Sequence, residues 1–245
     1  PLEIGLLDSN GRDMPLFIKG GESNGKTSAV IVLNKPEQTF VFENVPRPPV
    51  LSGNRAFTAP IWFKTALAPE QRGLLMAHDS DLFNRWDAGQ QFAADIMLDM
   101  VDAIQNGRAP DVPDAFIQAL RGYLNDNAAD KAFVARAFIM PSERALAERM
   151  NMIDVDAIHA ARTALRARIA AELADELAET YRANQTDGAY VPDAENSGRR
   201  AVKNMALACL CLHDDALAEK QYYSAAHMTD KDAAVRVFAG KNTPE

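Results

Sequence analysis

Residues 80–107 read SDLFNRWDAGQQFAADIMLDMVDAIQNG, and their apolar side chains recur at intervals of three and four. That spacing is typical of a helix with one buried face. The residues that share this face are Trp86, Ala93, Met97, Met100 and Ile104. Ser80 can serve as the N-cap, while Gly107, with Pro110 beyond it, marks the end. The pattern therefore predicts one long helix that packs against a core on a single side.

The sequence keeps this helical period from Ala68 onward. A second long helix is predicted over 154–183, with an i, i+4 ladder of Ala161, Leu165, Ile169, Leu173, Leu177 and Tyr181. Shorter amphipathic segments cover 113–124, 130–140, 142–150, 193–212 and 232–240. Many helices with short joints, and no strict sequence repeat among them, predict a bundle or an α-solenoid of stacked helix pairs.

The sequence before this region has a different character. Short runs rich in branched and aromatic residues, which favour strands, occupy 2–7, 14–19, 28–33, 39–45 and 57–65. Turn-forming residues separate them, and 45–54 (VPRPPVLSGN) is a proline-rich connection. We predict a mainly α chain with an N-terminal β part: an antiparallel sandwich over 1–65, followed by a helical, solenoid-like domain over 66–245.

Composition excludes several classes of partner. The chain has 245 residues, with 26 Lys plus Arg against 34 Asp plus Glu, a formal net charge of −8, and its basic residues are scattered. Nucleic acid is therefore not an expected partner. No apolar run approaches the roughly 18 residues that span a bilayer, and no basic leader precedes a cleavage site, so no membrane association is expected. The absence of an initiating Met predicts a piece of a longer protein.

Residues Gly20 to Thr27, GGESNGKT, satisfy the phosphate-loop pattern G-x-x-x-x-G-K-[ST]. That pattern binds phosphate only where a strand precedes it and a helix follows. Here the following residues, SAVIVLNK, favour a strand, and Pro36 limits any helix. We therefore interpret Gly20 to Thr27 as a hairpin loop and not as a nucleotide site.

The histidines show no metal-binding spacing. His78, His159, His213 and His227 are far apart, and none has a second histidine three or four residues away. His213 stands beside two aspartates at a predicted helix end, where capping explains it. His78 lies in AHDSD at a predicted joint between helices.

Other candidate catalytic residues also have structural explanations. Cys209 and Cys211 lie two apart in an apolar helical run, where they neither bridge nor chelate together. Reduced, buried thiols suit a cytoplasmic protein. The paired carboxylates Asp154 with Asp156, and Asp214 with Asp215, fall where caps and exposed joints are expected, and Trp86 with Phe83 falls on a core-facing stripe. We predict no catalytic, cofactor-binding or metal-binding residue in this chain.

Nine ordered segments together resemble the C-terminal part of the bacterial aminopeptidase N family of zinc metallopeptidases. They are 2–11, 36–45, 57–63, 78–90, 140–148, 153–162, 171–184, 198–210 and 227–234. The resemblance implies an immunoglobulin-like sandwich, incomplete at its N-terminus, and the first part of a helical C-terminal domain. In such enzymes an earlier domain holds zinc on HExxH and a more distant glutamate, and no position here matches those motifs. The family more often has Asn where His227 stands, and we assign that position no role.

What the resemblance implies is a noncatalytic fragment of a cytoplasmic zinc aminopeptidase, inactive by itself. Its expected partners are the parent's catalytic domain and, in the parent, peptide substrates; zinc is expected only in that missing domain. The helical domain would cover the active-site chamber, and an open sheet edge would invite pairing with another chain. The alternative is a stand-alone α-solenoid adaptor that binds peptides or proteins. A nucleotide-binding protein using Gly20 to Thr27 is a third hypothesis.

Overall fold

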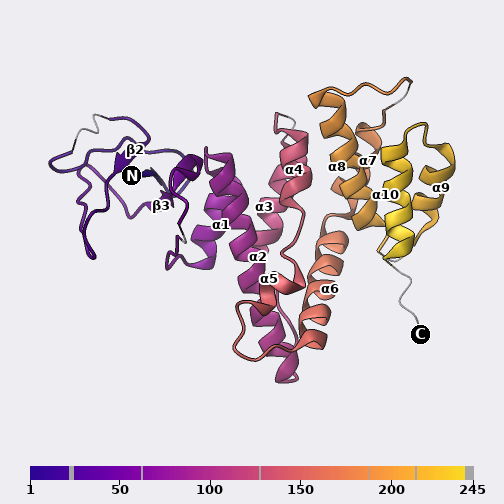
Figure 1. Ribbon diagram of the computed structural model, residues 1–245, viewed down its shortest axis with the longest axis horizontal. Coiled ribbons are helices and arrows are strands. Elements are labelled where there is room, and N and C mark those ends of the chain that lie inside the picture. Colours follow the sequence, from indigo (N-terminus) through magenta and orange to yellow (C-terminus); the bar gives the residue numbers. More distant parts are fainter. Residues whose placement is uncertain (22–24, 62, 127, 187, 213, 241–245) are drawn as a thin grey trace. The chain divides into compact units, whose positions relative to one another are not determined.

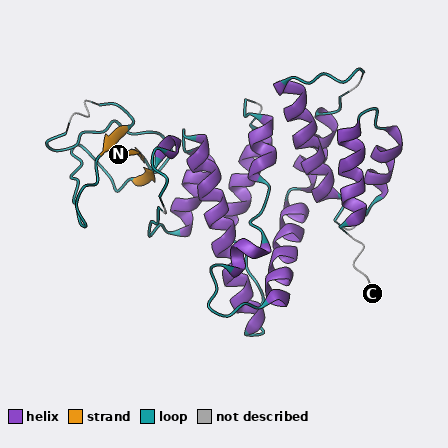
Figure 2. Cartoon of the chain, viewed as in Figure 1, coloured by secondary structure: helices purple, strands orange, loops and turns teal. Residues whose placement is uncertain are grey.

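The computed structural model describes residues 1–21, 25–61, 63–126, 128–186, 188–212 and 214–240. The chain divides into two compact units, Pro1–Phe92 and Ala93–Glu245, and the division falls inside one helix. Strands occur in the first unit, and helices dominate the second (Figures 1 and 2). The predicted order, a β part followed by helices, is confirmed.

The first unit contains a three-stranded antiparallel sheet with the order β2-β1-β3. β1 (Leu2–Leu7) is central, with β2 (Ala29–Ile31) and β3 (Val50–Gly53) on its two sides. The apolar side chains of β1 are buried, as expected for a central strand. β2 has its second edge unpaired among the described residues, and Val30 is 60% exposed there.

The sequence predicted more strands than the described residues form. Residues 14–19 and 39–45 form only an isolated bridge, Ile18 to Phe42, and 57–65 contributes no strand to the described residues. Asn44 has a φ of 58°, which interrupts an extended chain. β3 instead lies in the segment that we predicted to be a proline-rich connection. Prolines 48 and 49 end just before Val50, so they remove no hydrogen bond from the strand.

The first unit continues into α1 (Pro69–His78) and the start of α2 (Leu82–Gln105). α2 is the long helix predicted from 80–107, but its N-cap is Asp81 and not Ser80. The Asp81 carboxylate accepts a hydrogen bond from the Asn84 backbone N–H at 2.8 Å, so the carboxylate one residue later takes the capping role.

The C-terminal end of α2 is as predicted. Gly107 adopts a φ of 64°, and its N–H donates to the carbonyl of Ile104 at 3.1 Å, while Arg108 donates to Ala103 at 2.8 Å. This pair of bonds is a Schellman motif. Of the predicted buried face, Ala93, Met97 and Met100 are almost fully buried, and Trp86 and Ile104 are half-buried.

The second unit is built from helices that pack on one another, several of them out of sequence order. Their bounds are α3 (Asp114–Asn125), α4 (Lys131–Ala137), α5 (Glu143–Ala147), α6 (Val155–Glu172), α7 (Ala174–Ala183), α8 (Ala194–Leu210), α9 (Ala216–Ser224) and α10 (Met228–Ala239). α8 packs against α4, α7 and α10, and α9 lies beside α10 (Figure 1). We did not predict α9. In the part of the chain that the structure describes, no helix has the length and apolarity to cross a bilayer.

The single helix predicted over 154–183 is wrong, because the structure ends α6 at Glu172 and begins α7 at Ala174. Leu173 between them has φ −115° and ψ 21°, outside the helical region. The hydrogen bonds from the Leu173 N–H to Ile169 and from the Leu177 N–H to Leu173 persist across the break. The predicted ladder therefore remains buried from Ala161 to Leu177 although the backbone changes direction.

Candidate functional site

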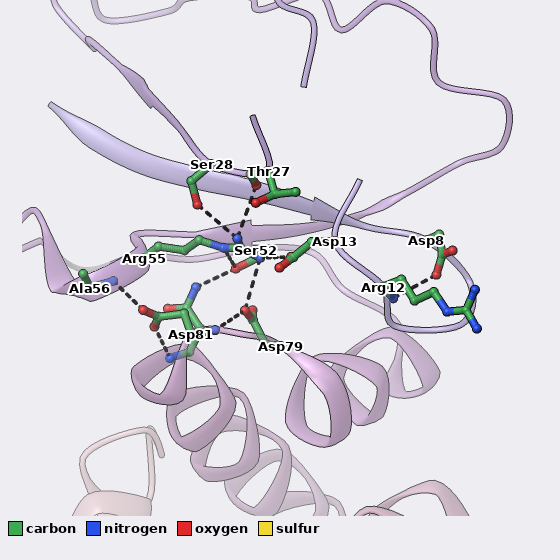
Figure 3. A network of polar contacts seen from close by, with 11 residues as sticks. Asp8, Arg12, Asp13, Thr27, Ser28, Ser52, Arg55, Ala56, Asp79 and Asp81 are labelled. Atoms are coloured by element: carbon green, nitrogen blue, oxygen red, sulfur yellow. Dashed lines mark hydrogen bonds and ion pairs between the residues drawn. The ribbon is translucent and has the colours of Figure 1, made fainter. Parts of the chain in front are cut away.

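The strongest polar cluster of the first unit surrounds Arg55, in a short 3-10 helix (Arg55–Phe57) that follows β3. The side chain is only 4% exposed. Its Nη2 lies 2.6 Å from an Asp13 carboxylate oxygen and 3.3 Å from one of Asp79, and its Nε donates to Ser52 Oγ at 2.8 Å (Figure 3). Charged hydrogen bonds of this kind are stronger than neutral ones and hold the guanidinium in one orientation.

Further partners connect Arg55 to the segment before β2 and to α2. Arg55 Nη1 donates to Ser28 Oγ at 3.1 Å and to the Thr27 carbonyl at 3.4 Å. Asn84 of α2 donates to Ser52 Oγ at 2.8 Å. The cluster therefore ties the sheet to the helices that follow it, within the first unit.

Asp79 is the buried acid of this cluster, and it follows the last residue of α1. Burial raises the pKa of its carboxyl; hydrogen bonds from Ser52 and the Asp81 backbone and the charge of Arg55 oppose that rise. The Asp81 N–H donates to Asp79 Oδ1 at 3.0 Å. Asp79 Oδ2 has no hydrogen-bond partner among the described residues.

The backbone next to Arg55 is strained. Asn54, Ala56 and Phe57 have φ values of 56°, 53° and 50°, which residues other than glycine rarely adopt. The Ala56 N–H donates to Asp81 Oδ2 at 2.9 Å (Figure 3), and Asn54 Oδ1 accepts from the Ala59 N–H at 2.9 Å. These bonds hold the strained turn, so the cluster maintains a connection between elements and presents no nucleophile paired with a base.

The phosphate-loop segment lies beside this cluster. Glu22, Ser23 and Asn24 are outside the described residues; Gly20 and Gly25 have φ values of 75°. Leu16 donates to the Lys26 carbonyl at 2.8 Å and accepts from the Gly25 N–H at 3.2 Å, as in a hairpin. A phosphate loop needs a helix after it, because the N-terminus of that helix points toward the phosphate. In this structure strand β2 follows Thr27 instead.

Each described histidine that was weighed as a metal ligand has its own local structural surroundings. His78 ends α1, at the predicted joint, and its side chain fills the space above Gly11. His159 Nδ1 lies 2.9 Å from Glu143 Oε1 on the exposed side of α6. His227 is 8% exposed, at the start of α10 and edge-on to the Tyr190 ring. His213 lies outside the described residues.

The other weighed residues take up structural positions. Asp154 caps α6 by accepting from the Ala157 N–H at 3.0 Å, and Asp214 accepts from the Ala216 N–H at 3.0 Å. Asp156 and Asp215 stand in the first turn of α6 and just before α9. The Trp86 ring packs against Phe83, with centroids 6.0 Å apart. Cys209 and Cys211 are free thiols, and burial raises the pKa of Cys209 to about 11.

A second buried ion pair joins the C-terminal helices of the second unit. Lys203 Nζ of α8 lies 2.5 Å from Asp230 Oδ2 of α10, and both side chains are 4% exposed. Asn204 donates to Asp230 Oδ1 at 2.9 Å, and Gln221 of α9 donates to the Asp230 carbonyl at 2.8 Å. Sequence reasoning missed both this pair and the Arg55 cluster.

The second unit contains an apolar cavity of about 550 Å³ between α4, α6 and α8. Its lining includes the apolar side chains of Phe138, Ile139, Met140, Ile169, Met205 and Leu212. Arg136, Arg162 and Arg166 lie in the same lining, and Arg162 Nε donates to the Pro141 carbonyl at 3.1 Å. An apolar floor with guanidinium groups suits a peptide that carries apolar and acidic side chains.

No zinc site is formed by the donor groups that the structure describes. Among those residues, no three His, Cys, Asp or Glu side chains are grouped so that they could hold a metal ion. The arrangement of these described donor groups does not fit a resident zinc.

The fold defines a class of protein: an immunoglobulin-like β part followed by a helical-repeat domain. Residues 1–66 match the family described as Domain of unknown function (DUF3458) Ig-like fold, and residues 69–245 match Domain of unknown function (DUF3458_C) ARM repeats. The chain belongs to this DUF3458_C family.

Its relatives are peptidases by name. Aminopeptidase N of Caulobacter vibrioides is 36% identical over 93% of this chain and 25% of that protein. The Escherichia coli protein of the same name is 34% identical over 100% of this chain and 28% of that protein. The chain is homologous to the C-terminal portion of aminopeptidase N and spans about a quarter of the length of these relatives. The crystal structure of Legionella pneumophila aminopeptidase A in complex with aspartic acid superposes with a TM-score of 0.77 at 22% identity, over 99% of this chain and 28% of that one. That likeness supports the fold.

Proposed function

We propose that this chain is the noncatalytic C-terminal part of a zinc-dependent aminopeptidase, in which the helical domain covers the active-site chamber. The observation that carries the proposal is 36% identity to aminopeptidase N over 93% of the chain. The described residues contain no group of donors that fits a metal. Because the chain matches the C-terminal portion of aminopeptidase N, catalysis in the intact enzyme would belong to a preceding domain, where zinc would polarise the attacking water.

Covering the chamber would restrict the enzyme to peptides and unfolded N-termini. A helical domain built from stacked pairs suits this role because it presents an extended surface whose helices support one another. We also propose a cytoplasmic location, which the two free thiols favour.

The test uses the reading frame upstream of Pro1 joined to this chain. We expect an HExxH motif with a downstream glutamate there. The long protein should hydrolyse an aminoacyl chromogenic substrate, and the 245-residue chain with added zinc should not. Removal of residues 69–245 should let the enzyme trim the N-termini of folded proteins that the long protein leaves intact. Robust hydrolysis by the short chain, or an upstream frame without the motif, contradicts the proposal.

The apolar cavity between α4, α6 and α8 favours a second candidate, a peptide-binding adaptor. Its guanidinium groups complement an acidic peptide, and its floor suits apolar side chains. A fluorescent peptide that alternates Leu and Glu should then bind the 245-residue chain and lose affinity in Arg166→Glu, whereas a Leu and Lys peptide should not bind. Equal affinity for both peptides would contradict the adaptor.

A further inference from the structure

The cavity between α4, α6 and α8 receives an apolar stripe from α8. Ala201, Met205 and Ala208 line it at intervals of four and three residues, so they lie on one side of the helix, and all three are only half-buried. Ile169 of α6 and Ile139, which is 51% exposed, add to this apolar surface. The volume of about 550 Å³ is in the range of small-molecule sites, and the surface suits an alkyl chain.

The charged part of the lining is entirely cationic. Its charged residues are Arg136, Arg162 and Arg166, and no Asp or Glu of the described ranges lines the cavity. The whole chain has a net charge of −8, so this local excess of positive charge is not a general property of the protein. Guanidinium groups gathered in this way attract an anion.

Two of these arginines occupy successive turns of α6. Arg162 and Arg166 are four residues apart, and side chains at that spacing have Cβ atoms about 5–6 Å from each other. The hydrogen bond from Arg162 Nε to the Pro141 carbonyl, at 3.1 Å, holds the first guanidinium at the cavity. Like charges at this spacing repel, so an anion that both guanidinium groups contact would relieve the repulsion.

Arg166 has donors that the protein does not use. Its side chain is exposed and forms no hydrogen bond or ion pair with another described residue. Burial raises the pKa of Cys209 on α8, and the charge of Arg166 opposes that rise, so the guanidinium acts across the cavity on the facing helix. Its N–H groups are therefore available to a ligand that lies between α6 and α8.

The polar side chains of the lining donate hydrogen bonds and offer no oxygen acceptor. Guanidinium groups are donors only, and the other lining residues are Ala, Phe, Ile, Met, Leu and Cys, whose sulfur atoms are weak acceptors. The backbone N–H groups of an inserted peptide would find no oxygen among these side chains, and an unpaired N–H costs free energy. An alkyl chain has no such group. The lining therefore favours an alkyl chain with an acceptor-only head over an acidic peptide.

We propose that this cavity binds an alkyl carboxylate, that is, a medium-chain fatty acid. The carboxylate accepts hydrogen bonds from Arg162 and Arg166, and the alkyl chain lies against Ile169, Met205 and Ala208. An ionised carboxylate only accepts hydrogen bonds, and its two oxygens match the paired donors of a guanidinium group. The proposal goes beyond both functions proposed above and rests on neither of them.

Isothermal titration of the 245-residue chain with sodium octanoate tests the proposal. Octylammonium is the control for charge, because it keeps the alkyl chain and reverses the charge of the head group. Acetate is the control for the head group alone. We expect octanoate to bind, with an affinity that falls as salt is raised, and neither control to bind at the same concentration. The fluorescent peptide of Leu and Glu is titrated in parallel, since it is the rival occupant of this cavity.

Two pairs of variants at exposed positions locate the ligand. Arg166→Gln should weaken octanoate binding about fivefold or more, because it removes a charged donor. Its matched control is Arg168→Gln, since Arg168 is also an exposed arginine of α6 but pairs with Glu172 and does not line the cavity. Ile139→Asp places a carboxylate beside that of the ligand and should also weaken binding about fivefold or more. Ile153→Asp, the same change at an exposed isoleucine outside the lining, should leave the affinity unchanged.

Octanoate binding that is weaker in at least one site variant than in its matched control supports the proposal, whether or not the peptide also binds. The proposal is overturned if octanoate does not bind at about 10 mM, if octylammonium binds equally well, or if both site variants bind as tightly as their controls. Binding of the peptide without binding of octanoate overturns it as well and leaves the adaptor standing. Binding of octanoate without binding of the peptide contradicts the adaptor and supports the fatty-acid site.

Discussion

Gly5 lies directly against the guanidinium of Arg55: a Cβ built on Gly5 would come within 2.1 Å of Arg55 Cζ and 2.5 Å of its Nε. Gly5 is in the central strand of the sheet, and Arg55 is held from the other side by two carboxylates and two hydroxyl groups. Because Gly5 has no side chain, the buried guanidinium of Arg55 has room to lie against the central strand.

Gly5→Ala should destabilise the chain by about 2–3 kcal/mol, because neither the strand backbone nor the fixed guanidinium can move aside. The measurement is the urea midpoint of unfolding, followed by circular dichroism. Gly122→Ala, at an exposed helical position with open space around it, is the control for the glycine-to-alanine change itself. A Gly5→Ala midpoint equal to that of the original chain would contradict this account of the contact.

The burial of Asp79 predicts a pH dependence of stability. Because the folded pKa is raised above the ordinary 3.8, the folded chain holds this proton more tightly than the unfolded chain. The contribution of Asp79 to the free energy of unfolding is then largest below pH 3.8 and falls as the pH rises through the folded pKa.

Asp79→Asn removes this titration, so the stability of the original chain minus that of the variant should decrease as the pH rises from about 3 toward neutrality. Urea unfolding of both proteins over that range measures the difference. A difference that increases with pH would show that the charge of Arg55 outweighs burial and would reverse our account of the cluster.

Individual residues show which features of the fold can be predicted from the sequence. Met97 and Leu165 were placed in the core from periodicity alone, because helical burial follows from local spacing. The break at Leu173 could not be seen, since the residue stays buried and keeps its hydrogen bond to Ile169. β3 was missed because its pairing depends on a partner strand far away in the sequence.

The polar clusters escaped prediction for the same reason. Arg55 meets Asp13 across 42 positions and Asp79 across 24, and no local pattern records such a pairing.

The ion pair between Lys203 and Asp230 should behave as a unit. Lys203→Met leaves the Asp230 carboxylate buried, with the Asn204 amide as its side-chain donor among the described residues, and should cost about 3–5 kcal/mol. Asp230→Leu alone leaves a buried ammonium and should cost a similar amount. The double variant should cost clearly less than the sum, because no uncompensated charge remains. Urea unfolding of the original chain, the two single variants and the double variant gives the double-mutant cycle. If the two single losses of stability add up to the loss in the double variant, Lys203 and Asp230 are not coupled.

Two glycines with open space around them should respond to alanine in opposite directions. Gly107 holds a φ of 64° in the Schellman motif after α2, whereas Gly122 is an exposed residue inside α3. Gly107→Ala should destabilise by about 1 kcal/mol because of its left-handed backbone. Gly122→Ala should stabilise by about 0.5–1 kcal/mol because alanine favours the helix. Thermal unfolding compares them, and shifts in the same direction would contradict the backbone assignment.

Cys209 should be a slow nucleophile in the folded chain. Burial raises its pKa from 9.0 to about 11, so at pH 8 its thiolate fraction is about 100-fold lower than that of an unperturbed thiol. In a Cys211→Ala background, where Cys209 is the single thiol, iodoacetamide at pH 8 should label the folded chain at least about 100-fold more slowly than the urea-unfolded chain. The folded rate should keep rising as the pH approaches 11, as long as the circular dichroism is unchanged. Rapid labelling at pH 8 with a plateau near pH 9 would show that the surroundings of Cys209 do not disfavour its thiolate.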